Sequence, residues 1–417
     1  MNSTRSPNPA ASKNSNCSRC RTQGRGGQAL DLLEPALAVL AQDEPDESIA
    51  LLAAEVARIH LFEGDTAKAL ERVEMALKIA EDLVLPRVLS QALNTKALLL
   101  RSHPHEGRGL MREALAIALD HDLLVEALRA YNNLIVIENE ADRPHEAAKH
   151  VRAGFDLARS RGQMQFTIGF GLTGLVSELL EQGQYDEAFA FAEQLPLPAH
   201  LVVPSHAFGA LMLARAAVER GDETTTQHWL DRVSKDVETS TDQQHVSLSN
   251  YKRFVGALLA GDNAGALALI EPAARHGFAQ GWIDGIAVYT NEAATLALDV
   301  GDAKLALPVA AVLGEIPAAR RGRRGEIALG RVRGNVAAAE GDDDTAAEAF
   351  ARALAAARNL EQPMSLAPVL LDYGRWLVDS GRAGEATPLL DEARAIFERM
   401  GARAWLNRLD AVATVTA

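Results

Sequence analysis

Cysteine is almost absent from this sequence of 417 residues: Cys17 and Cys20 are the only two. Because both fall within the first twenty residues, the rest of the chain has no disulfide framework, which favours a reducing compartment. Long apolar runs are absent as well, since no stretch approaches the roughly 20 uninterrupted apolar residues of a membrane-spanning helix. The first residues also lack the apolar segment of a secretory signal. We therefore expect a cytoplasmic protein that makes no membrane contact.

Aromatic residues and net positive charge are also scarce. Aromatics make up 5% of the chain, whereas Ala and Leu dominate, and this composition favours helix over strand. The formal net charge is −14. Proteins that bind nucleic acid generally carry a basic face. We therefore do not expect a nucleic-acid partner.

Catalytic motifs are missing too. The sequence has no phosphate-binding G-x-x-x-x-G-K-[ST] loop, no G-x-G-x-x-G after a strand-like run, and no G-x-S-x-G, H-E-x-x-H or kinase motif set. Cys17-x-x-Cys20 could form half of a structural zinc site, but such a site needs four ligands and no second cysteine pair exists. We expect the two cysteines to be incidental. The prediction is a non-enzyme with no catalytic residues, no cofactor and no metal.

What the sequence does contain is a repeat. Its length exceeds the roughly 250–300 residues at which one compact core stops growing, which leaves several domains or one elongated array. Turn signals recur in steps of 38 to 41 residues, at Gly24, Gly64, Pro104, Asp142, Gly183, Gly221, Gly261, Gly301, Gly341 and Gly381. Glycine can end a helix in the left-handed conformation, and the Asp that follows several of these glycines can cap the next helix.

Small residues keep the same register around these turns. Seven positions before a turn lie residues such as Ala57 and Ala294, and five positions after a turn lie residues such as Ala69 and Ala346. Small side chains there allow two antiparallel helices to approach closely. The spacing resembles the tetratricopeptide repeat, although the unit has about 40 residues instead of 34. We therefore predict an all-α, right-handed α-solenoid of antiparallel helix pairs, tetratricopeptide-like, with about ten turns over residues 24–417.

The two ends of this array differ. Residues 1–23 are rich in Ser, Asn and Arg, and we expect a disordered basic tail. The following segment, QALDLLEPALAVLAQ from Gln28, is apolar almost all round and matches the second helix of a pair whose first helix is absent. We therefore expect an incomplete first repeat, either because the chain is a piece of a larger protein or because a partner covers this end. The last segment, 403–414, has the mixed polarity of a terminal cap.

Six arginines fall within fourteen residues, and they form the candidate docking patch: Arg320, Arg321, Arg323, Arg324, Arg331 and Arg333. Three interpretations are open: a solvated connector and helix face, docking onto an acidic surface of this chain or of another protein, or nucleic-acid binding. The third is the weakest, because no aromatic side chains interleave the arginines as stacking platforms.

The C-terminal third resembles a more specific group of proteins. The runs IPAARRGRRGEIALGRVR, AAAEGDDDTAAEAFARALAAAR and LLDYGRWLVDSGRAGEATPLLDEARAIFERMGARAWLNRLDAV are similar to the helical-repeat tails of large bacterial signalling ATPases. These are the class III adenylate/guanylate cyclases fused to an ATPase module and the large ATP-binding LuxR-type regulators. In both groups the resemblance implies a regulatory arm that senses an inducer or partner. Neither the ATPase and cyclase modules nor a helix-turn-helix is present in this sequence.

The hypothesis that follows is a non-catalytic protein-interaction or sensory module. We expect it to bind a protein or peptide on its concave face, since solenoids offer an extended concave surface, or else a small effector. The resemblance implies the regulatory arm, or a remnant, of an ATPase-coupled nucleotide cyclase. The alternatives are a remnant of a LuxR-type regulator without its DNA-binding domain, and a free-standing scaffold.

Overall fold

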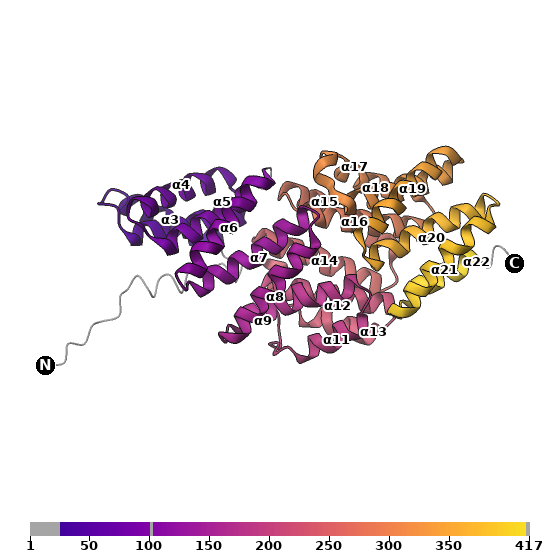
Figure 1. Ribbon diagram of the computed structural model, residues 1–417, viewed down its shortest axis with the longest axis horizontal. Helices are drawn as coiled ribbons and strands as arrows, with labels where there is room; N and C mark the ends of the chain where they lie inside the picture. The colour runs from indigo at the N-terminus through magenta and orange to yellow at the C-terminus, as the bar shows by residue number, and fades with distance from the viewer. Residues whose placement is uncertain (1–25, 101–102, 414–417) are drawn as a thin grey trace. The chain divides into compact units, whose positions relative to one another are not determined.

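The described part of the chain is built from α-helices joined by short turns (Figure 1). The structure, a computed structural model, describes residues 26–100 and 103–413. Over these residues no strand forms, and the one departure is an isolated parallel bridge between Leu201 and Val233. No helix in these ranges has the length and apolarity that crossing a bilayer requires. The all-α prediction is confirmed.

The helices alternate between two roles in an antiparallel pair. The first helices are α3 (Glu47–Glu63), α5 (Pro86–Leu99), α7 (Leu124–Glu140), the continuous run α9 (Met164–Gly169), η1 (Phe170–Leu175) and α10 (Val176–Glu181), then α12 (Pro204–Arg220), α14 (Gln243–Leu259), α16 (Ile283–Val300), α18 (Ala318–Glu340), α20 (Pro363–Asp379) and α22 (Arg403–Ala413). The second helices are α2 (Gly26–Leu40), α4 (Thr66–Asp82), α6 (Pro104–Asp120), α8 (Pro144–Ser160), α11 (Tyr185–Gln194), α13 (Glu223–Arg232), α15 (Asn263–Ala279), α17 (Leu307–Gly314) after the turn η3 (Ala303–Ala306), α19 (Asp343–Leu360) and α21 (Ala383–Met400).

Left-handed residues end the first helices at the repeating turns. Within the described residues, the predicted turn glycines at 64, 183, 221, 261, 301, 341 and 381 all have positive φ, between 68° and 89°. Asp142 adopts this conformation at φ 59°, and Pro104 begins α6. The next Asp then caps the second helix, as where Asp342 accepts a hydrogen bond from the backbone N of Thr345 at 3.1 Å. Gly24, the tail 1–23 and both cysteines lie outside the described residues.

The connectors between pairs also use left-handed residues, which the sequence analysis did not predict. Residues with positive φ stand at Val84, Asp122, Gly162, Gly281, Gly322, Glu361 and Gly401. Residues with positive φ therefore occur at both edges of the repeat array. Non-glycine residues occupy three of these connectors, where the surrounding helices must compensate for the steric cost.

Small residues let the paired helices pack closely. Ala57 and Ala69 are fully buried between α3 and α4. In the pair α18–α19, a Cβ added at Gly334 would lie 2.6 Å from the ring of Phe350. The core is thus a series of small clusters between neighbouring helices, as in other solenoids.

Some second helices are shorter than the regular repeat implies. Both α11 and α13 have 10 residues and α17 has 8, whereas α4, α6 and α8 have 17. The chain after α11 is irregular, and the backbone N of Leu201 donates to the carbonyl of Arg232 at 2.7 Å. The chain after α13 forms a short 3-10 helix, η2 (Lys235–Thr239). The near-constant spacing of the glycines therefore does not imply helices of constant length.

The described chain divides into two compact units. Unit 1 contains the residues up to Ile137 together with Val202–Pro204 and Ser234–Leu248, and unit 2 contains Glu138–Leu201, Ser205–Val233 and the chain from Ser249. Both units are built from the same kind of helix pair, and the extent of the predicted solenoid, residues 24–417, stays a prediction.

Within unit 2, residues about 180 positions apart meet at opposite edges of the repeats. Asp142 lies against Arg323, and Glu181 against Gln362, each pair being 181 residues apart. The earlier residue lies at a turn within a pair, and the later one at a connector between pairs. With a repeat of about 40 residues, this offset is about four and a half repeats. Unit 2 therefore coils so that one edge of the array rests on the other.

Candidate binding face on the first helices

First helices that are not direct neighbours contact one another on one side of unit 2. In unit 2, Nε and Nη2 of Arg215 on α12 donate to the carboxylate of Glu292 on α16, at 2.9 and 2.8 Å. In the order of first helices, α14 comes between α12 and α16, so α12 and α16 are not direct neighbours. Side chains from next-nearest helices can meet only on the side where the array curves inward. We call this surface of the first helices the inner face.

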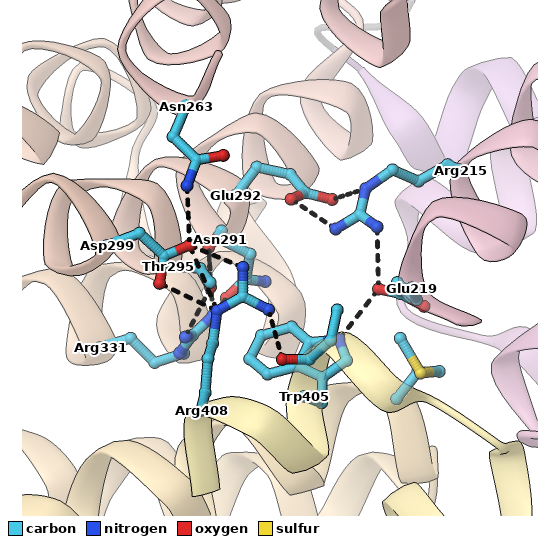
Figure 2. Close-up of polar contacts among 12 residues, drawn as sticks. Arg215, Glu219, Asn263, Asn291, Glu292, Thr295, Asp299, Arg331, Trp405 and Arg408 are labelled. Carbon is cyan, nitrogen blue, oxygen red and sulfur yellow. Dashed lines mark hydrogen bonds and ion pairs between the residues drawn. The ribbon is translucent and has the colours of Figure 1, made fainter. Parts of the chain in front are cut away.

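A buried ion-pair network occupies the inner face of unit 2 (Figure 2). Nη1 of Arg215 also approaches Glu219 at 3.2 Å, and Trp405 Nε1 donates to Glu219 at 3.1 Å. The hydroxyl of Tyr185 donates to the same carboxylate. Burial lowers the pKa of Arg215, but the charges of Glu292 and Glu219 outweigh it and the net pKa is raised. Burial raises the pKa of Tyr185 well above its ordinary value, so both groups keep their protons at neutral pH.

A second cluster on this face is centred on Arg331, which is 2% exposed. Its Nε donates to Asp372 at 2.9 Å, and its other nitrogens donate to Thr295 at 3.0 Å and to the carbonyl of Asn291 at 3.1 Å. Asp372 also accepts from Asn335 at 3.0 Å. The charge of Arg331 is therefore fully compensated within the chain.

The last helix completes the polar lining of unit 2. On α22, Nη2 of Arg408 donates to Asp299 of α16 at 2.6 Å (Figure 2), and the ring of Trp405 stacks on Phe397. A cavity of about 210 Å³ remains between α16, α20 and α22. Most charged groups of this inner face thus bind other groups of the same chain.

The inner face of unit 1 is formed by α3, α5 and α7. Arg58 is bound to Glu55 on the same helix, with its Nε at 3.0 Å. Gln91 donates to Glu126 at 2.8 Å, and this bond joins α5 to α7. Further along the same two helices, Asn133 of α7 donates to Asn94 of α5 at 2.7 Å. These contacts join α5 to α7 and engage the carboxylates of Glu55 and Glu126.

Arg129 of α7 has no such partner. Within the described residues its guanidinium makes no hydrogen bond or ion pair, although its charge interacts with Arg58, Glu55 and Glu126. Burial, and then the positive charge of Arg58, lower the pKa of Arg129 to about 10. The residue still keeps part of its surface accessible. Protein atoms therefore surround this cation without covering it.

No protein-family model and no curated protein sequence matches this chain. Among solved structures, the human IFIT1 dimer with m7Gppp-AAAA is similar with a TM-score of 0.44 and 13% identity, covering 94% of this chain and 91% of that chain. The Rap protein complexed with competence and sporulation factor has a TM-score of 0.31 and 12% identity, covering 97% of each chain. Yeast Tom70 has a TM-score of 0.30 and 12% identity, covering 98% of this chain and 96% of that chain. Likenesses of this size identify no ligand, and the ATPase parentage stays a prediction.

The six arginines of the candidate docking patch lie in different surroundings. Arg323 binds Asp142, Arg324 binds Glu181 at 2.7 Å, and Arg331 is buried as described above. Arg321 donates to Glu326 at 3.1 Å, Arg320 is partly exposed, and Arg333 is exposed. Docking of a partner on this cluster therefore stays a prediction that concerns its exposed members alone. For the described residues, no group of three or more His, Cys, Asp or Glu is arranged to hold a metal.

The inner face was not predicted, although the sequence contains a signal for it. Six positions before the turn glycine the residue is polar in six of the seven described turns, with Val255 as the exception: Arg58, Ser177, Arg215, Thr295, Asn335 and Arg375. This position is next to the small residue that packs the helix pair, so it turns toward the concave side. Arg129 is not on this register, and no spacing rule singles it out.

Proposed function

We propose that this chain is a non-catalytic binding module, and that the inner face of unit 1 holds an extended segment of a partner protein. The observation that supports the proposal is the unpartnered guanidinium of Arg129 among engaged carboxylates. In unit 2 the corresponding polar groups bind one another. Unit 1 therefore has unused capacity to bind a charged group, and we assign the partner's site there.

The size of this face favours a peptide segment over a small effector. Packed helices lie about 8–10 Å apart, so α3, α5 and α7 together span about 20 Å. An extended chain rises about 3.3 Å per residue, so roughly six residues would cross the face. Gln91 and Asn133 are partly exposed and offer amide groups along this path.

A binding role without catalysis agrees with the titratable groups. The tyrosines with strongly raised pKa values, Tyr185 and Tyr251, are buried in or beside the ion-pair network of unit 2. Burial moves both pKa values away from neutral pH, whereas a general acid or base works best with a pKa near the working pH.

A more specific role for this module is supported only by the resemblance of the C-terminal third to the repeat tails of signalling ATPases. It favours a cytoplasmic regulatory arm, or remnant, of an ATPase-coupled nucleotide cyclase. A LuxR-type remnant and a free-standing scaffold are the alternatives. Reading the DNA around the coding region tests the three directly: an ATPase or cyclase module upstream favours the first, a helix-turn-helix module downstream favours the second, and neither favours the third.

Peptide selection with mapped crosslinking tests the proposed binding face. Short random peptides are selected on phage against the full chain. A photo-crosslinking amino acid is then placed at Gln91, on the inner face, or at Lys78, which is exposed on the second helix α4. We expect selected peptides to crosslink from position 91 and not from position 78. Failure to select any peptide, or equal crosslinking from both positions, would show the proposed function to be wrong.

A further inference from the structure

One second helix of unit 2, α17, is apolar on every side. Its sequence is LPVAAVLG, and it packs against α15, α16 and α18. The residues that face these helices are buried: Val309, Ala310, Val312 and Leu313. The residues on the other side are exposed and equally apolar: Leu307, Pro308, Ala311 and Gly314. A helix that is apolar all round is normally covered on all sides.

Other second helices carry charged residues on their outward side. Helix α19, the next second helix in the chain, exposes Glu348, Arg352 and Arg358. Helix α4 exposes Lys68 and Lys78. A place among the second helices therefore does not explain the apolar outward side of α17, and this side has the character of a surface that another molecule covers.

Two hollows flank α17. The larger has a volume of about 630 Å³ and lies between α17 and α19, where Leu329, Val336 and Ala349 contribute to its lining. The smaller has a volume of about 240 Å³, lies between α17 and α15, and is lined in part by Leu267 and Leu305. A regular second helix such as α4 has 17 residues, whereas α17 has 8. The short α17 thus forms a ridge beside an open groove.

We propose that this surface is an interface between two copies of the chain, in which the α17 ridge of each copy lies in the larger groove of the other. The inference concerns unit 2 and does not depend on the proposed function of unit 1. A two-fold dimer uses the same patch on both copies, so the patch must complement itself. A ridge and a groove side by side meet this requirement, and helices pack ridge into groove in the same way within a core.

The charges at the rim of the groove favour a second copy over a strongly charged partner. Glu326 lies 3.1 Å from Nε of Arg321 and 3.5 Å from Nη2 of Arg352. Arg333, exposed at the rim, interacts electrostatically with Asp342. Because these opposite charges engage one another, the rim has little to attract a purely acidic or purely basic segment. It is the apolar surface that remains for a partner, and a second copy supplies the matching shape.

The size of the patch is enough for a dimer of modest affinity. Residues 326–340 of α18 line the groove, a length of about 20 Å at the helical rise. Helices α15, α17 and α19 lie side by side at spacings of about 10 Å, so the patch is at least about 20 Å wide. Two copies would then bury about 1,000 Å², which is near the lower limit for a specific interface. We expect a dissociation constant of roughly 1–100 µM.

Sedimentation velocity of the full chain, at concentrations around this value, tests the proposal. We expect a monomer–dimer equilibrium that Leu307→Glu weakens at least about 100-fold, because the new charge would be buried in an apolar groove. Ala355→Arg, on the exposed wall of the groove, should weaken it from the other side. Leu119→Glu is the matched control, since Leu119 of α6 is 47% exposed and Leu307 is 44% exposed. It should leave the dimer unchanged, and urea unfolding should show all three variants folded.

Salt gives an independent readout. The chain has a formal net charge of −14, so two copies repel each other. Screening weakens this repulsion, and an apolar interface should therefore be as strong or stronger at high salt. A dimer that dissociates at high salt would be held by charges, which would contradict the proposal.

Crosslinking locates the contact. Cys17 and Cys20 are replaced by Ser, and one chain carries Ala311→Cys on the ridge while another carries Ala355→Cys on the groove wall. A short bis-maleimide should join the two chains in a mixture. It should join Ala311→Cys to Lys78→Cys, on α4 of unit 1, far more slowly.

The outcomes separate a second copy from other occupants. A chain that is monomeric at every concentration, or a dimer that Leu307→Glu leaves intact, overturns the proposal. A monomer that binds an added amphipathic helical peptide, and loses it in Leu307→Glu, would show that a partner helix fills the groove instead. Peptide crosslinking from Gln91 in unit 1 is read in the same variants, so failure of the dimer and failure of the proposed function can be told apart.

Discussion

Arg323 donates three hydrogen bonds to Asp142, although the two residues are 181 positions apart in the sequence. The Nε and the backbone N of Arg323 both donate to Oδ2 of Asp142, and Nη2 donates to its carbonyl at 3.2 Å. Asp142 has a positive φ of 59° at a turn, and Gly322 has a positive φ of 61° at the connector that meets it. The pair therefore joins the two edges of the array where unit 2 coils onto itself.

Breaking this contact should loosen the coil in a salt-dependent way. The Arg323 side chain is 40% exposed and that of Asp142 is 23% exposed, so we expect a coupling energy of about 1 kcal/mol at low salt. A double-mutant cycle with Asp142→Asn and Arg323→Gln, read by urea unfolding, measures it. Screening should reduce the coupling at high salt. The ion pair Arg382–Glu385, which lies within one helical turn, is the control. Breaking it should leave hydrogen exchange in α7 unchanged.

The buried pair of Arg331 and Asp372 should behave differently. Asp372→Ala leaves a buried cation without its carboxylate, which costs about 3–5 kcal/mol. The double variant Arg331→Met with Asp372→Leu should cost clearly less, because no charge is left unpaired. Hydrogen exchange of the α18 amides provides the measurement. Equal losses in the single and double variants would contradict this account.

The turn at Gly341 gives a test of the repeat itself. Its φ is 75° and a Cβ would meet no atom within 4 Å, so Gly341→Ala changes only the backbone strain. We expect a loss of about 1 kcal/mol. Gly384 is helical and equally open, so Gly384→Ala should be neutral or stabilising. Chemical denaturation of both variants compares the two conformations directly.

Individual residues show which parts of the structure could be predicted from the sequence. Gly341 and Asp342 predict a helix end and a helix cap, because each residue acts on its own neighbours in the chain. Nothing local links Asp142 to Arg323, since the coil arises from small rotations that accumulate over four or five helix pairs. The same reason left the arginine cluster with three open interpretations. The lack of a partner for Arg129 could not be predicted from the sequence, because it depends on Glu55 pairing with Arg58 and on Glu126 pairing with Gln91.

Glu34 joins α2, the first described helix, to α3 and α4. Its carboxylate accepts from Arg72 of α4, at 2.8 Å from Nη2, and lies 2.7 Å from Nε2 of His60 on α3. The hydrogen bond with Arg72 is the main cause that lowers the pKa of Glu34, partial burial opposes it, and His60 adds to the lowering. Glu63 nearby has the opposite shift, because burial and then the charge of Asp242 raise its pKa.

These shifts predict how acid affects helix α2. A carboxylate whose pKa is lowered by folding contributes stability that is present above its ordinary value of 4.5 and is lost as pH falls toward the lowered value. We expect α2 to lose about 1 kcal/mol between pH 6 and pH 3, in the range of partly exposed ion pairs. Glu63 works in the other direction, since its raised pKa means that protonation favours the folded state. Comparing the protein with its Glu34→Gln variant removes this opposing contribution, because both retain Glu63. Hydrogen exchange of the α2 amides, corrected for the intrinsic effect of pH, should therefore accelerate in acid relative to the variant. If both proteins responded to acid alike, the Glu34 contacts would not be what holds α2 in place.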